Sequence, residues 1–265
     1  MRIPNGILFA GLHGELTLHP WRDPVAAESD AYSLFHSRSV AMGWLTEARE
    51  GATGGFWGMN DAGQQGPDPN AQHPYTLWFQ VVLPRLVSPK QSLPLQPFLA
   101  CIGDVIDRMG RFQLDALQVL LPLQSFDRLA DDLSHRDIMY ASLGSTGWFF
   151  DRNPSAAARV QVVLDGGQSP AIRLVAVELF QRLQQVKQTV FVCDEFSLTD
   201  DTNLEKPIYI DNLWVGPPQH PLTLYGTLAE WSLDALGWLA TFLASESFKF
   251  GVTTPLLLTV SRFEG

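Results

Sequence analysis

The sequence predicts an α+β protein in which helices pack on one side of a largely antiparallel sheet. Two observations lead to this fold class. The order strand, helix, strand recurs three times along the chain, and further strand-like segments, rather than helices, separate these units. Strict alternation would instead predict a doubly wound parallel sheet with a Gly-rich phosphate loop after its first strand, and the chain shows neither. A mixed α/β sheet is the alternative prediction.

The clearest unit is "LTLYGTLAEWSLDALGWLATFL", residues 222–243. Its first residues alternate as in a strand, and Ser232 then suits a helix N-cap, with Asp234 in the first turn, where a negative charge favours the helix dipole. Apolar residues recur at spacings of three and four after this cap, which predicts a helix with one buried face. Gly251 is expected to end the helix, and "TPLLLTVSR" (254–262) predicts a returning buried strand.

Two earlier segments repeat this order. One has strands at 75–84 and 114–122 around a helix near 95–110, and the other has strands at 158–167 and 189–196 around a helix that begins after Ser169. In element order the chain resembles tandem split βαβ, or ferredoxin-like, units. We therefore expect a first α+β unit at 1–150 and a second at 151–265.

Two further patterns bear on this organisation. The tetrapeptide "QVVL" occurs at 80–83 and again at 161–164, which suits an internal duplication. The segments 138–150 and 208–216 are strand-like, and they place strands directly after strands.

A Gly-rich segment covers residues 49–74, and its six glycines and three prolines show no periodicity. Loops of this length tend to be functional or disordered. Phe56, Trp57 and Met59 lie near its centre, and such large apolar groups favour burial. The segment is therefore expected to be a lid over a pocket, an interface with a partner, or disordered.

Composition narrows the function classes. The chain has 265 residues, with 18 Lys and Arg against 28 Asp and Glu, so its formal charge is −10. This charge disfavours nucleic-acid binding, which requires a basic surface. No apolar stretch approaches the roughly 20 residues of a membrane span, and the first residues do not resemble a signal peptide. We expect no membrane partner and a cytoplasmic location, with Cys101 and Cys193 as buried free thiols.

No motif identifies a reaction, so enzymatic activity is left open and no cofactor is assigned. His73, at the junction of the Gly-rich segment with a strand, and Glu230, beside Trp231 at a helix start, are the candidate proton-transfer groups. No metal site is predicted, because His13 and His19 on one strand would lie about 20 Å apart.

Two groups of residues are candidates for binding a ligand or a partner. Apolar side chains at loops and strand ends can form hot spots or complete the core, and a dense acidic stretch can face a basic partner or line a solvated linker. The candidates are Phe56, Trp57, Met59, Trp148, Trp214, Trp231, Asp194, Glu195, Asp200 and Asp201.

The leading hypothesis is a non-catalytic interaction or scaffold protein that self-associates or binds a protein partner. The alternative is a small-molecule-binding protein or enzyme with a cavity between sheets, covered by residues 49–74. A third interpretation is an acidic protein that binds a basic partner through residues 194–205.

Overall fold

A computed structural model describes residues 6–22, 30–46, 54–64, 75–83, 86–87, 91–126, 146–151, 153–186, 188–198 and 220–263. Its strands are β1 (Ile7–Leu18), β2 (Gly58–Gln64), β3 (Tyr75–Val82), β4 (Gly110–Leu121), β5 (Ala158–Asp165), β6 (Phe191–Ser197), β7 (Pro221–Leu228) and β8 (Leu256–Arg262). Its helices are α1 (Ala31–Ala41), α2 (Leu95–Met109), α4 (Ala171–Leu174), α5 (Ala176–Gln185) and α6 (Leu233–Lys249). Short 3-10 turns lie at Leu123–Ser125, Thr146–Phe149 and Pro154–Ala156.

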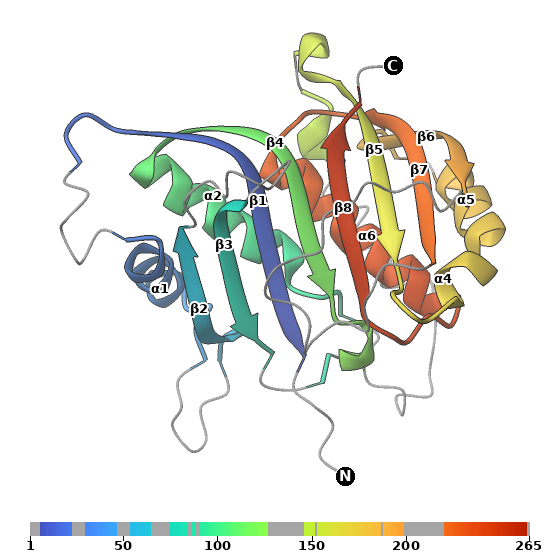
Figure 1. Ribbon diagram of the computed structural model, residues 1–265, viewed down its shortest axis with the longest axis horizontal. Helices are drawn as coiled ribbons and strands as arrows, with labels where there is room; N and C mark the ends of the chain where they lie inside the picture. The colour runs from blue at the N-terminus through green and yellow to red at the C-terminus, as the bar shows by residue number, and fades with distance from the viewer. Residues whose placement is uncertain are drawn as a thin grey trace.

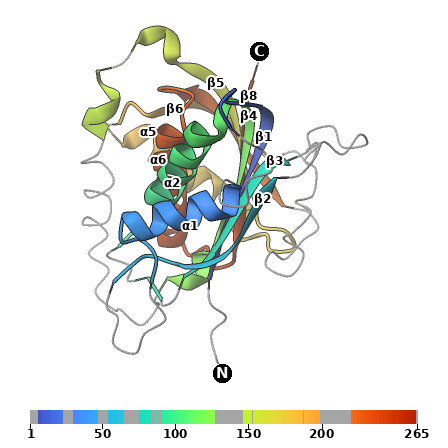
Figure 2. The same ribbon diagram turned by 90° about the vertical axis from the view of Figure 1, so that its left-hand side faces the viewer.

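The eight strands form one sheet in the order β2-β3-β1-β4-β8-β5-β7-β6, and neighbouring strands pair antiparallel (Figure 1). Seen edge-on, the sheet has the labelled helices on one side (Figure 2). The α+β class and the largely antiparallel sheet with helices on one side are therefore confirmed.

The strand order repeats between the two halves of the chain. The first half runs strand, helix, strand, strand, helix, strand, and its sheet order is β2-β3-β1-β4. The second half has the same order of elements, with α4 and α5 in place of one helix, and its sheet order is β6-β7-β5-β8. The halves meet where β4 pairs with β8. This junction also brings together α2 and α6, the last helix of each half.

Alternate apolar side chains along the strands point to the two faces of the sheet and form the core. In β1, Leu8, Ala10 and Leu12 are buried in the large cluster beneath the helices, as period-two patterning requires. Phe9 lies on the other face, in a small buried cluster with Leu120 and Leu257. The sheet therefore buries apolar residues on both faces near its centre.

Several elements occur where the sequence predicts them. Helix α2 occupies the region expected near 95–110, and α6 begins after Ser232, whose side chain accepts a hydrogen bond from the Ala235 amide. Gly251 follows α6 with φ +89°, a conformation that favours glycine. The three predicted strand–helix–strand units correspond to β3–α2–β4, β5–α4–α5–β6 and β7–α6–β8.

Other expectations are wrong. Helix α1 was not predicted, so a fourth strand–helix–strand unit, β1–α1–β2, was missed. Residues 58–64 of the expected 49–74 loop form β2. The two "QVVL" copies lie in β3 and β5, which hold different places in the repeated order, so this tetrapeptide does not support a duplication. Of the strand-like segment 138–150, the described part begins with the 3-10 turn at Thr146–Phe149; 208–216 lies outside the described residues.

Candidate functional site: the α2–α6 groove

Helices α2 and α6 lie side by side beneath the centre of the sheet (Figure 2). A small residue allows the approach. A Cβ built on Gly237 of α6 would lie 3.3 Å from the Cα of Gln96 on α2, closer than most side chains tolerate. A Cβ on Gly103 of α2 would lie 3.6 Å from the Leu233 side chain, an ordinary contact, so Gly237 is the position where the small residue matters. The surface above this contact is hollowed, and we call it the α2–α6 groove.

The groove consists of adjoining hollows. The central one, about 390 Å³, lies between α2 and the start of α6 and is lined by Asp104, Asp107, Trp231 and Asp234 among others. A hollow of about 290 Å³ beside Trp148 shares Asp234 with it. A hollow of about 460 Å³ between α1 and α2 shares Asp104 and Asp107 with it, and one of about 580 Å³ near the end of β8 shares Trp231.

Helix α2 supplies one wall through residues on a single face. Gln96, Ala100, Gly103 and Asp107 line successive parts of the groove at spacings of three and four. From Gln96 to Asp107 a helix rises about 16 Å at 1.5 Å per residue. An extended chain covers this distance with about five residues. The groove is therefore long enough for a short peptide segment.

The central hollow is strongly acidic. Its lining includes three aspartates, Asp104, Asp107 and Asp234, and no basic residue among those described there. Arg38 approaches Asp104 from α1, with 2.6 Å between Nη2 and Oδ2. Burial raises the pKa of the Asp234 carboxyl, and the negative charges of Glu230 and Asp104 raise it further. A cation in this hollow would relieve the repulsion that opposes ionisation of Asp234.

Trp231 and its neighbours form the boundary between the central hollow and the hollow near β8. The Trp231 indole Nε1 donates to the Leu114 carbonyl at 2.8 Å, which fixes the ring. The guanidinium carbon of Arg262 lies 5.2 Å from the centre of that ring. Next to it, the Ser232 hydroxyl donates to Glu230 Oε1 at 2.6 Å and also accepts from the Ala235 amide, so one side chain both caps α6 and holds the carboxylate.

Three residues singled out in the sequence meet at this groove. Glu230 and Trp231 line the hollow near β8, and Trp231 also lines the central one. Trp148, 73% exposed, lines the hollow beside Asp234 although it lies more than 80 positions away in the chain. The acid whose pKa is raised is Asp234, which the sequence reasoning had treated only as a complement to the helix dipole.

The remaining candidates lie elsewhere. Trp57 is fully buried in the core, where its ring packs against Phe35 and Phe98, while Phe56 is exposed and Met59 is partly buried. The core position leaves Trp57 no surface for a partner.

The acidic candidates Asp194 and Glu195 lie on the edge strand β6, where Asp194 forms an ion pair with Arg159. His73, Trp214, Asp200 and Asp201 fall outside the described residues.

The sequence reasoning missed Asp104, Asp107 and Arg262. On α2 the two aspartates follow Ala100 and Gly103 on the face opposite the apolar stripe, a pattern that also describes any solvated helix face. Only the approach of α6, which is distant in sequence, turns this face into a groove wall. Arg262 gave no sequence signal, because the Trp231 ring over which it lies comes from another element.

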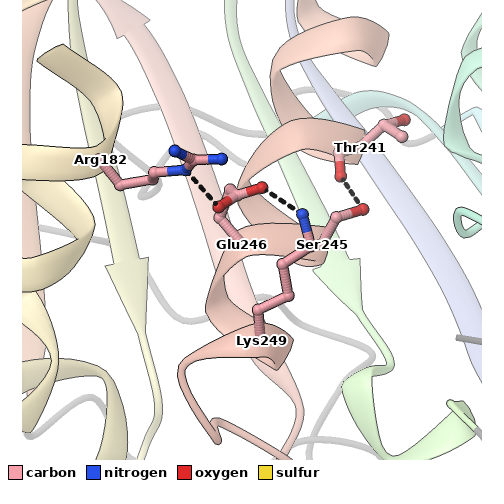
Figure 3. Close-up of polar contacts among 5 residues, drawn as sticks. All are labelled: Arg182, Thr241, Ser245, Glu246 and Lys249. Carbon is pink, nitrogen blue, oxygen red and sulfur yellow. Dashed lines mark hydrogen bonds and ion pairs between the residues drawn. The ribbon is translucent and has the colours of Figure 1, made fainter. Parts of the chain in front are cut away.

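A separate polar hollow, of about 490 Å³, lies between α5 and α6. Glu246 is only 3% exposed and forms ion pairs with Arg182 at 3.2 Å and with Lys249 at 2.6 Å (Figure 3). On the same helix, Ser245 donates its hydroxyl to the Thr241 carbonyl. The carboxylate of Glu246 is thus already paired with two cations, so we assign this hollow a structural role.

Within the described ranges, no group of three or more His, Cys, Asp or Glu residues is arranged to hold a metal ion. Both cysteines are free and buried, as predicted. Burial raises the pKa of Cys101 to about 11 and that of Cys193 to about 12, so neither is a thiolate at neutral pH.

Comparison of the chain with protein-family models, with curated proteins and with solved structures finds no match. Among the helices in the described ranges, none combines the length and the apolar character needed to span a bilayer.

Proposed function

We propose that the protein is a non-catalytic interaction protein whose α2–α6 groove binds a short segment of a protein partner through a basic residue. The observation that carries this proposal is the central hollow, lined by three aspartates and no described basic residue. A Lys or Arg side chain of the partner would enter this hollow, because charge-assisted hydrogen bonds to carboxylates are the strong ones in proteins.

The aromatic residues support a protein partner. Trp148, which is 73% exposed, lines the hollow that shares Asp234 with the acidic hollow. Tryptophan is among the residues that contribute most to the binding energy of protein interfaces. A partner segment would place its basic residue in the hollow and an apolar residue on Trp148.

The sheet edges favour the groove over strand pairing as the contact surface. Edge strand β2 has a register shift between Met59 and Asp61, and edge strand β6 has one between Cys193 and Glu195. Bulges and edge charges are devices that prevent strands of different chains from pairing. Self-association through these edges is therefore the weaker form of the interaction hypothesis.

The scaffold of this proposal consists of two ferredoxin-like units. Each half has the element order of such a unit, and the strand orders β2-β3-β1-β4 and β6-β7-β5-β8 support this interpretation. We divide the units at about residue 150, as the sequence suggests. The two free thiols fit the reducing environment of the cytoplasm.

Peptide binding measured by fluorescence polarisation tests the function. The probe is a labelled pentapeptide of Gly and Ser with one Lys and one Leu, and the comparison peptide has Gln in place of Lys. Replacing both Asp107→Asn and Asp234→Asn should weaken binding of the Lys peptide about tenfold or more, since contacts to charged groups contribute about 1.5–3 kcal/mol each.

The matched control removes two exposed acids outside the groove instead, Glu178→Gln on α5 with Glu195→Gln on β6. This control should leave affinity unchanged. If it reduces binding as much as the groove variant does, the overall negative charge attracts the peptide and the groove does not bind it. If neither the Lys peptide nor an Arg version binds the wild-type protein at all, the proposed function is refuted.

A further inference from the structure

We propose that the Arg262–Trp231 end of the groove binds a carboxylate, so that the groove recognises a peptide segment carrying a basic and an acidic residue close together. This inference rests on the proposed function and specifies its ligand. It concerns the hollow of about 580 Å³ near the end of β8, which is lined by Arg159, Glu230, Trp231, Ser232 and Arg262 among others.

The position of the Arg262 side chain favours binding of an anion. Its guanidinium carbon lies over the indole of Trp231, 5.2 Å from the ring centre, and that ring is itself fixed by the hydrogen bond from Nε1 to the Leu114 carbonyl. A guanidinium has several N–H donors in a planar fork that matches the two oxygens of a carboxylate. Part of the entropy of ordering this long side chain is therefore already lost before a ligand arrives.

The other charged groups of this hollow have protein partners. Arg159 forms an ion pair with Asp194. Glu230 accepts a hydrogen bond from the Ser232 hydroxyl. By contrast, within the described part of the chain no carboxylate lies at ion-pair distance from Arg262, although Arg38, Arg159 and Arg182 each have one. Among the described residues that line this hollow, Arg262 is thus the cation without a carboxylate partner.

The two ends of the groove favour ligand groups of opposite charge. The central hollow contributes Asp104, Asp107 and Asp234, and the neighbouring hollow contributes Arg262, with Trp231 and Ser232 lining both. In an extended segment, side chains two residues apart lie about 7 Å from one another on the same face. A ligand that crosses Trp231 would therefore place a carboxylate two to four residues from its basic residue.

The test is a double-mutant cycle between peptide and protein. Labelled pentapeptides of Gly and Ser carry Lys at the first position and Glu at the third, fourth or fifth, and matched peptides carry Gln in place of Glu. With the wild-type protein, at least one Glu peptide should bind about tenfold more tightly than its Gln partner. With Arg262→Gln this preference should disappear, and Arg262→Lys should restore only part of it because Lys lacks the planar fork.

The control variant is Arg111→Gln, which removes an exposed cation from β4 outside the hollow. It should keep the full preference for Glu. A preference that is equal in the wild-type protein and Arg262→Gln overturns the inference, and so does the absence of any preference for Glu. If the preference for Glu is missing but Lys peptides still bind, and lose affinity in the Asp107→Asn, Asp234→Asn protein, the proposed function stands while this inference fails. If no peptide binds, both fail.

Discussion

The buried carboxylate of Glu246 provides a sharp test of how the second half of the chain is held together. Glu246 on α6 pairs with Arg182 of α5 and with Lys249 one turn further along α6 (Figure 3). The side chains of Glu246 and Lys249 are 3% and 9% exposed, whereas that of Arg182 is 31% exposed. If Glu246 is removed, water therefore stabilises the unpaired charge of Arg182 far better than that of Lys249.

Replacing Glu246→Gln should destabilise the protein by about 3 kcal/mol, because breaking a buried pair leaves an uncompensated charge. The smaller end of the usual range applies, since Arg182 reaches solvent and the amide retains an acceptor for Lys249. Lys249→Met should cost about 1.5 kcal/mol, because Glu246 keeps its contact with Arg182. In the double variant the buried charge pair is absent, so its cost should be about 2 kcal/mol, clearly below the sum of the two single changes.

Urea unfolding followed by circular dichroism measures these differences, and thermal unfolding provides a second reading. A loss of 3 kcal/mol corresponds to a fall in Tm of about 6–12 °C for a chain of this size. The control is Glu178→Gln on the exposed face of α5, with an expected change within about 0.5 kcal/mol. A loss below about 1 kcal/mol for Glu246→Gln, or strict additivity in the double variant, would refute the reasoning.

Four further outcomes follow from the structure. In the native protein Cys101 and Cys193 should not react with a thiol reagent at pH 7.5, because burial raises their pKa values to about 11 and about 12. The unfolded protein should react with two equivalents of the reagent. Fast reaction of either cysteine in the native protein would contradict its burial. Replacing Gly237→Val should destabilise the protein by about 2 kcal/mol by separating α2 from α6, as urea unfolding would show, and a neutral result would mean that the helices are not in close contact. Ser232→Ala should cost about 1 kcal/mol in the same assay through loss of the α6 cap, and a change below the experimental error would argue against the capping bond. The pKa of Asp234 is raised from 3.8, so the folded protein binds this proton more tightly than the unfolded chain does. The resulting contribution to stability is present below pH 3.8 and is lost as the pH rises through the folded pKa. Asp234→Asn should remove this dependence from stability measured between pH 3 and 7, and an unchanged profile would contradict the reasoning.

Local signals were sufficient for most of the fold. The N-cap at Ser232, the apolar spacing of α6 and the alternation in the strands each reflect interactions within a few residues, and the structure has these elements in place. Helix α6 differs in its burial: all residues from Ala235 to Ser247 are buried, whereas the spacing predicted one buried face. Helix α1 was missed because its apolar residues do not form a clear stripe; only Ala31, Phe35 and Ser39 are buried, and Phe35 is held by aromatic contacts from distant elements.

The Gly-rich segment shows the limit of reading composition. Its glycines predict a loop, yet residues 58–64 pair with β3 and complete one edge of the sheet. Gly63 is useful there because a Cβ at that position would lie 3.1 Å from the Trp78 indole nitrogen, so the small residue makes room for the neighbouring ring. Pairing with an established strand outweighs the low strand propensity of glycine.

The candidate site was less predictable than the fold because it is assembled from both halves of the chain. Asp107 comes from α2, Asp234 from α6, and Arg262 from the end of β8, so no short stretch of the sequence contains all three. Helices α2 and α6 hold equivalent places in the repeated order of elements, so a single half would supply only one wall of the groove. Joining β4 to β8 places these walls side by side, and Gly237 allows their close approach. The repeated order of elements thus accounts for the sheet and its two central helices, whereas the candidate binding groups lie where the two halves meet: acids on the helices, an arginine on the last strand, and Trp231 between them.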